Sequence, residues 1–138
     1  MNSYTFNQIN IGDSESFVCD ITEEKMRLFY ELSGDCSPIH MNSDYAAKRG
    51  YEGRVCYGML LASFFSTLAG VYLPGEHCLL HSVDSKFVSP VFIGDTLTVS
   101  GTVTEKNELF KEITIKADIK NQKGKKVCRA VIKAGLAE

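Results

Sequence analysis

Two side chains suited to proton transfer lie close together in the segment Ser33-Gly34-Asp35-Cys36-Ser37-Pro38-Ile39-His40. A carboxylate and an imidazole form a suitable pair for moving protons near neutral pH. Proline fixes its own φ and restricts the residue before it, so Ser37-Pro38 is expected to form a stiff turn. Such a turn can hold Asp35 and His40 at a fixed separation. The segment therefore predicts an acid–base pair, although an aspartate after glycine is also a common turn residue that bonds its own backbone.

Two helices are expected to position this turn. Residues 22–32 form an amphipathic pattern, with Thr22 as N-cap and acidic residues in the first turn. Their apolar side chains recur at helical spacing, at Met26, Phe29 and Leu32. Residues 58–72 are apolar on nearly every face, which predicts a helix enclosed by protein. This helix would be roughly 22 Å long, which is too short to span a membrane.

The second half of the chain predicts an antiparallel sheet that could enclose the second helix. Apolar and polar residues alternate over 96–103, over 113–120 and, less cleanly, over 127–134, and such alternation is typical of strands with one buried face. Turn residues at 106–108 and 121–124 separate these strands, and consecutive hairpins favour antiparallel pairing. The predicted fold class is therefore α+β, with a curved sheet around a buried helix.

Composition excludes several classes of function. The 138 residues fit one domain, 1–138, with 44% hydrophobic and 23% charged residues. A net charge of −2 and the lack of a basic block give nucleic-acid binding no support. No segment has the ~20 apolar residues of a membrane span, and the first residues lack the pattern of a signal peptide. Five cysteines without a Cys-x-x-Cys motif predict neither disulfides nor zinc, and a cytoplasmic location is expected.

Three motifs together resemble those of the MaoC-like dehydratases and (R)-specific enoyl-CoA hydratases. The first motif is matched by Phe29, Tyr30, Leu32, Ser33, Gly34, Asp35, Pro38, Ile39, His40 and Ala46. The second is Gly58-Met59-Leu60, and the third is Phe87-Val88-Ser89-Pro90-Val91-Phe92-Ile93-Gly94-Asp95. The chain departs from the family pattern at Ser37, where the family usually has Asn, and at Tyr57, where it commonly has His. The matches run in the family's order over about half of the chain.

The resemblance implies a hotdog fold and the reversible syn addition of water to a trans-2-enoyl thioester. Asp35 would be the main base and His40 its partner on the same water molecule. The first N–H groups of the helix beginning at Gly58 would stabilise the thioester oxygen, although Gly58 could instead serve only close packing. Ser66 would support the active-site loop together with Ser37. For Tyr57, both the acyl pocket and the contact with a dimer partner remain open.

The implied substrate is an acyl thioester of CoA or of an acyl carrier protein, and no cofactor or metal is expected. Three basic residues are candidates for contacting the substrate phosphates, namely Arg49, Arg54 and Lys86. Hotdog domains commonly pair through a sheet edge, so a homodimer or a larger homo-oligomer is expected.

Two other functions stay open at this point. One is a hotdog acyl-thioesterase, which usually places its acid on the buried helix; residues 58–72 contain neither Asp nor Glu. The other is a non-catalytic acyl-binding subunit, which the replacement at Ser37 allows and the intact Asp35/His40 pair disfavours.

Overall fold

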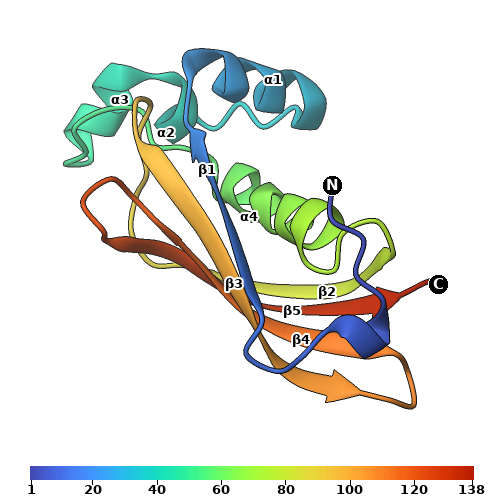
Figure 1. Cartoon of the computed structure of the whole chain (residues 1–138). Coiled ribbons are helices and arrows are strands. Elements are labelled where there is room, and N and C mark those ends of the chain that lie inside the picture. The colour runs from blue at the N-terminus through green and yellow to red at the C-terminus, as the bar shows by residue number, and fades with distance from the viewer.

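A five-stranded antiparallel sheet curves around helix α4 (Gly58–Thr67) in the computed structural model, which describes residues 1–138 (Figure 1). The order of strands in the sheet is β1-β3-β4-β5-β2. The strands are β1 (Ser14–Asp20), β2 (Cys78–Phe87), β3 (Thr96–Asn107), β4 (Glu112–Lys120) and β5 (Lys126–Leu136). This arrangement confirms the predicted α+β class and the expected hotdog fold.

Alternation along the three central strands places one face of the sheet against α4. The residues of β4 that point inward are all buried, and so are their counterparts on β5, at Ile113, Ile115, Ala117, Ile119, Cys128, Ala130, Ile132 and Ala134. Gly101 of β3 allows the helical layer to approach closely, because a Cβ there would lie 2.7 Å from Ile115 and 2.8 Å from Leu68. The predicted core of the sheet is therefore confirmed.

Helix α1 (Glu23–Ser33) starts and ends where local sequence signals place its ends. The Thr22 hydroxyl accepts a hydrogen bond from the Lys25 N–H at 3.1 Å, as expected of an N-cap. Gly34 ends the helix with φ = 74°, a left-handed conformation that glycine adopts without strain. The prediction for 22–32 is confirmed within one residue at each end. Leu32 does not join the apolar face, however, since it is 85% exposed.

Helix α4 differs from its prediction in two ways. The α-helix ends at Thr67, and the chain continues as a π-helix, η2 (Leu68–Tyr72). One face of α4 is also open, because Met59 is 65% exposed and Ser63 and Ser66 are exposed as well. The expectation of complete enclosure is therefore wrong for this face, which lies beside edge strand β2.

Three short helices complete the fold. A 3-10 turn, η1 (Phe6–Gln8), lies near the N-terminus. Helix α2 (Pro38–Met41) and helix α3 (Ser43–Lys48) follow α1. Helices α1, α2 and α3 lie together beside one end of the sheet (Figure 1). No helix of the structure combines the length and the apolar character needed to cross a membrane.

Candidate active site

The Asp35–His40 segment is a compact turn that links α1 to α2. The Asp35 carboxylate accepts a hydrogen bond from the Ser37 N–H at 3.1 Å through Oδ1. The Ser37 carbonyl in turn accepts one from the His40 N–H at 3.0 Å, and Pro38 occupies the first turn of α2. Two hydrogen bonds and Pro38 therefore hold the turn, and Oδ2 of Asp35 has no hydrogen-bond partner in the chain. The side chain of Ser37 makes no capping bond, so its contribution comes from the backbone.

The imidazole of His40 is held in one orientation by a distant segment. Its Nδ1 lies 2.6 Å from the carbonyl oxygen of Val55. A carbonyl can only accept, so Nδ1 carries the proton and Nε2 presents a lone pair. Arg54 fixes the backbone of the same residue, since its Nε donates to the His40 carbonyl at 2.7 Å while Nη1 pairs with Glu23 at 2.6 Å. His40 is therefore preorganised as a proton acceptor.

Tyr57 joins the two halves of the acid–base pair. Its hydroxyl donates to the Asp35 carbonyl at 2.8 Å, and its ring lies 4.2 Å from the His40 ring between centroids. Burial raises the pKa of the Tyr57 hydroxyl, with the Asp35 carboxylate as the next cause, so the group stays a neutral donor. Tyr57 is 1% exposed and packs against Phe29 inside its own chain. It therefore acts as a support for the turn.

His40 and the first residue of α4 share one pocket of about 350 Å³. Gly58 lines this pocket, and a Cβ there would lie 3.3 Å from the Phe87 ring. The first hydrogen bond of the helix runs from the Leu61 N–H to the Tyr57 carbonyl, so the N–H groups of the preceding turn have no partner within the helix. These donors and the helix dipole favour an oxygen atom that gains negative charge.

The structure brings some of the predicted residues together and separates others. Asp35 lies on the same turn as His40, but its carboxylate is exposed and does not line the pocket. Ser66 lines a different pocket of about 450 Å³ between α4 and β2, and its hydroxyl makes no hydrogen bond to the active-site loop. The expected support of that loop by Ser66 is therefore absent within one chain.

The candidate phosphate contacts lie in three different places. Arg49, the residue that follows α3, stacks on Tyr45 of that helix, with 4.5 Å from its guanidinium carbon to the ring centroid, and donates to the hydroxyl of that tyrosine. Arg54 is engaged by His40 and Glu23, so we assign it to positioning the turn. Lys86 lies on β2, at the rim of a groove on the outer face of the sheet.

The thiol of Cys56 is buried beside the site. Cys56 lines the His40 pocket, but burial raises the pKa of its thiol to about 12, so the thiol is protonated near neutral pH. Sequence reasoning missed two contributors, the Val55 carbonyl and the Phe87 ring. A backbone carbonyl carries no sequence signal, whereas Phe87 belongs to the third motif and could have been placed from it.

Removal of the Tyr57 hydroxyl tests its role as a support. Tyr57→Phe should lower the free energy of unfolding by about 1 kcal/mol, because the bond to the Asp35 carbonyl is lost. Urea titration at constant protein concentration measures this change. Tyr30→Phe is the matched control, since Tyr30 is 37% exposed and its hydroxyl makes no hydrogen bond. An equal loss in both variants would contradict the assigned role.

Comparison with known proteins places this site in a family. A profile of the MaoC-like domain matches residues 10–125. The (R)-specific enoyl-CoA hydratase of Rhodospirillum rubrum is 41% identical over 99 residues, which cover 72% of this chain and 69% of that protein. The enzyme of the same name from Aeromonas caviae is 40% identical over 80 residues, 58% of this chain and 60% of the relative.

Solved structures agree with this result. The unliganded R-hydratase PhaJ1 from Pseudomonas aeruginosa superposes with a TM-score of 0.90 at 28% identity, covering 97% of this chain and 86% of that one. The (R)-hydratase from A. caviae involved in PHA biosynthesis has a TM-score of 0.88 at 30% identity, with 93% and 97% covered. Sequence profile, relatives and fold agree, and the chain belongs to the MaoC-like domain family.

Proposed function

We propose that this chain is an (R)-specific enoyl-thioester hydratase, which adds water reversibly and syn to a trans-2-enoyl thioester. One observation carries the proposal: the His40 imidazole, oriented by the Val55 carbonyl, shares a pocket with the N-terminus of α4. The family's curated hydratases and a 3-hydroxybutyryl-CoA dehydratase from Methylorubrum extorquens, 31% identical over 100 residues, support it.

The chemistry follows from the groups on the turn and on α4. The attacking water is held between the free Oδ2 of Asp35 and Nε2 of His40. As its oxygen bonds to C3, one proton of the water passes to this acid–base pair, and the pair returns one proton to C2 on the same face, so both side chains end in their starting protonation states. Negative charge develops on the thioester oxygen during this step. The free N–H groups at the start of α4 stabilise this negative charge. Loss of one donor of this kind typically raises the activation free energy by about 2.7–4 kcal/mol. No cofactor is required.

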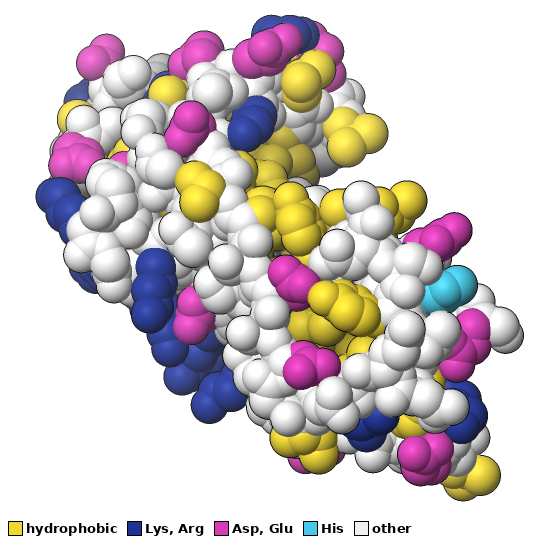
Figure 2. All heavy atoms as spheres, in the orientation of Figure 1, with side chains coloured by type: hydrophobic (Ala, Val, Ile, Leu, Met, Phe, Trp, Pro, Cys, Tyr) yellow, Lys and Arg dark blue, Asp and Glu magenta, His cyan; other side chains and the backbone are white.

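The single chain leaves the site open, so we include a second copy in the proposal. Strand β2 is an edge of the sheet and pairs only with β5. Exposed apolar side chains follow this edge and the open face of α4, at Met59, Leu79, Leu80, Phe87 and Val88. Figure 2 shows further hydrophobic side chains in the hollow between α1 and α4. A second copy would cover this surface and enclose Asp35.

The dimer has a direct test. Light scattering at micromolar concentration should give about twice the chain mass of 15.3 kDa, because an apolar edge of this kind is rarely left uncovered. A mass of one chain at all concentrations would contradict the proposed assembly.

The cellular setting belongs to the same proposal. All five cysteines are free thiols in the structure, which supports a reducing compartment such as the cytoplasm.

The activity itself is tested with crotonyl-CoA. Hydration removes the conjugated double bond and its ultraviolet absorbance without release of free CoA. Appearance of free thiol would instead indicate a thioesterase, which the lack of Asp and Glu on α4 disfavours. A stable absorbance across several acyl lengths, with protein that binds the thioester, would indicate a non-catalytic acyl-binding subunit.

A further inference from the structure

The His40 pocket has a buried apolar floor and an open mouth. The lining residues of the floor are buried, namely Cys56, Leu61 and Val91. The lining residues of the mouth are exposed, namely Tyr51, Phe87 and Val88. A short acyl chain can be buried against the floor, so the thiol-derived half of a thioester must leave the pocket through the mouth.

Tyr51 is a polar side chain of this pocket that the proposed mechanism does not use. Besides His40, three lining residues carry polar side-chain atoms, namely Tyr51, Cys56 and Ser89. The Cys56 thiol is buried at the floor, and Ser89 is partly buried. Tyr51 is 37% exposed, and its hydroxyl makes no hydrogen bond within the chain. This hydroxyl is therefore available to a ligand that passes through the mouth.

The end of helix α3 fixes the backbone of Tyr51. Gly50 follows the helix with φ = 88°, a left-handed conformation that suits glycine. The Gly50 N–H donates to the Ala47 carbonyl at 3.0 Å, and the Tyr51 N–H donates to the Ala46 carbonyl at 3.1 Å. These two bonds form a Schellman motif, which closes the helix. Tyr51 is therefore preorganised, and little backbone entropy is lost when its hydroxyl binds a ligand.

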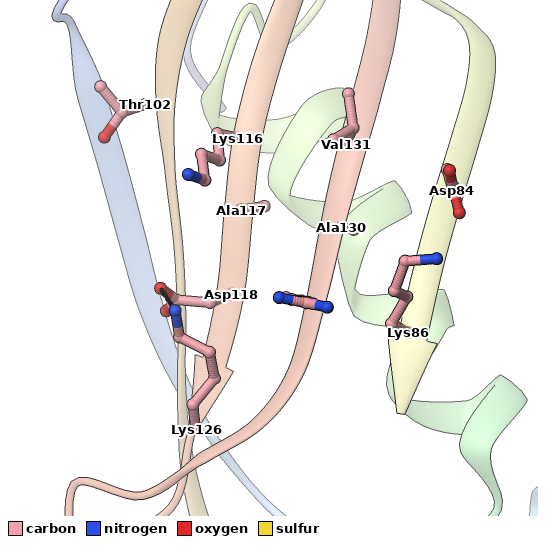
Figure 3. Close-up of a pocket in the computed structure, with 10 residues that line it drawn as sticks. Asp84, Lys86, Thr102, Lys116, Ala117, Asp118, Lys126, Ala130 and Val131 are labelled. Carbon is pink, nitrogen blue, oxygen red and sulfur yellow. Dashed lines mark ion pairs between the residues drawn. The ribbon is translucent and has the colours of Figure 1, made fainter. Parts of the chain in front are cut away.

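The Tyr51 side of the mouth stays accessible in the proposed dimer. Phe87 and Val88 belong to the apolar edge that a second copy would cover, whereas Tyr51 lies in the segment between α3 and α4. The groove that Lys86 lines opens on the outer face of the sheet, and α4 lies behind the sheet in that view (Figure 3). Side chains of that groove are therefore separated from the mouth by the sheet, and Tyr51 is the polar group beside the way out.

We propose that the Tyr51 hydroxyl donates a hydrogen bond to the first amide carbonyl of the pantetheine arm of the substrate. The inference rests on the proposed hydratase function and adds a substrate-positioning residue to it. This amide is the first polar group beyond the thioester, two methylene groups from the sulfur. A tyrosine suits the place, because its ring forms part of an apolar wall while its hydroxyl donates one hydrogen bond.

The first measurement tests binding without turnover. Butyryl-CoA carries the same arm but lacks the double bond, so it cannot be hydrated. Calorimetric titration compares the native chain with Tyr51→Phe and with the matched control Tyr30→Phe. Tyr30 is also 37% exposed and makes no hydrogen bond through its hydroxyl, but it lies outside this pocket. Tyr51→Phe should raise Kd about three- to tenfold, because one neutral hydrogen bond is lost, and the control should bind as the native chain does.

The second measurement compares thioesters with and without the amide. Crotonyl-N-acetylcysteamine ends just beyond the first amide, and the S-pentyl thioester of crotonic acid replaces this amide by methylene groups. The native chain should prefer the amide-containing thioester in kcat/KM, and Tyr51→Phe should reduce this preference about three- to tenfold. For crotonyl-CoA, KM should rise by the same factor while kcat stays within about twofold, because a contact made equally in ground state and transition state contributes to binding alone.

The outcomes separate this inference from the proposed activity. An unchanged Kd for butyryl-CoA in Tyr51→Phe, or an equal change in Tyr30→Phe, overturns the role of Tyr51 whatever the enzyme does. A fall of kcat at constant KM overturns it too, because the hydroxyl would then act on the reacting atoms. An unaltered preference for the amide also rejects the proposed contact. Absence of turnover with every thioester would reject the hydratase instead, and the butyryl-CoA titration would still decide whether Tyr51 binds the arm.

Discussion

Asp35→Asn and His40→Ala should each lower kcat for hydration of crotonyl-CoA by about a hundredfold or more. The proposed mechanism places both groups on the same water molecule, Asp35 through its free Oδ2 and His40 through the Nε2 that its bond to Val55 leaves free. KM should change less than kcat, since neither side chain is needed for the contacts of the CoA moiety. Initial rates of absorbance loss at saturating substrate measure the effect.

Structural damage must be separated from lost chemistry. His40→Ala leaves the Val55 carbonyl without its partner, whereas His40→Asn can still donate to it from the side-chain amide. Both variants should be equally inactive. His77→Ala and Asp44→Asn are matched controls, because the His77 ring hydrogen-bonds to Ser3 and Asp44 lies in the first turn of α3. Near-native rates in either Asp35→Asn or His40→Asn, with an intact fold, would refute the assignment.

Much of the fold could be predicted because local patterns in the sequence determine it, namely apolar–polar alternation in the strands and capping residues at the helix ends. Strands β3 and β4 alternate cleanly enough to give both their existence and their buried face. Helix α1 has an N-cap at Thr22 and a left-handed glycine at its end, two signals that do not depend on the rest of the chain. The open face of α4 could not be predicted, because its serines and alanine resemble a packed helix as well as an interface.

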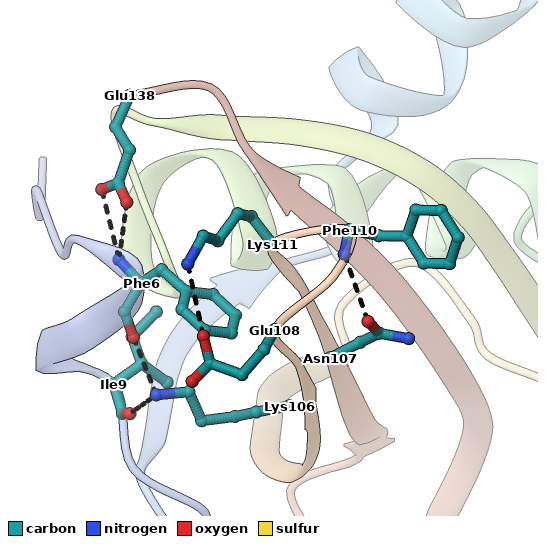
Figure 4. A network of polar contacts seen from close by, with 8 residues as sticks. All are labelled: Phe6, Ile9, Lys106, Asn107, Glu108, Phe110, Lys111 and Glu138. Carbon is teal, nitrogen blue, oxygen red and sulfur yellow. Dashed lines mark hydrogen bonds and ion pairs between the residues drawn. The ribbon is translucent and has the colours of Figure 1, made fainter.

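Long-range polar contacts escaped the sequence analysis for a different reason. Residues 106–108 resemble a turn in the sequence, yet β3 continues to Asn107. The side chain of Lys106 contacts the N-terminal segment. Its ammonium group donates to the carbonyls of Phe6 and Ile9 at 2.8 and 2.6 Å (Figure 4). Glu138 accepts from the Phe6 N–H nearby at 3.2 Å. These partners are about a hundred residues or more apart, so no local pattern can show them.

The candidate site also combines residues that are close in sequence, which could be predicted, with contacts between distant segments, which could not. Asp35 and His40 could be named because the turn that carries them is continuous in sequence. The orientation of His40 comes from Val55, and the link to Asp35 comes from Tyr57, so both depend on how the segment before α4 folds back against the turn. Chemistry was therefore predictable where it is local, and preorganisation was not.

Phe65→Ala should lower the free energy of unfolding by about 3–5 kcal/mol. Phe65 is 0% exposed and belongs to the core between α4 and the sheet. Truncation removes the transfer free energy of the ring and leaves a cavity that β-sheet backbone cannot collapse to fill. Urea unfolding followed by circular dichroism at fixed protein concentration measures the loss, and the slope of the transition should stay unchanged.

Phe110→Ala provides the matched control for this loss. Phe110 undergoes the same chemical change, but it is 66% exposed in the hairpin turn between β3 and β4. Its truncation should cost less than about 0.5 kcal/mol, because a surface substitution removes little buried area. If both variants lose the same stability, burial of Phe65 is not what holds α4 against the sheet. The first residue of α4 shares a pocket with His40, so Phe65→Ala should also reduce the rate of hydration at temperatures where the native chain is still folded and active.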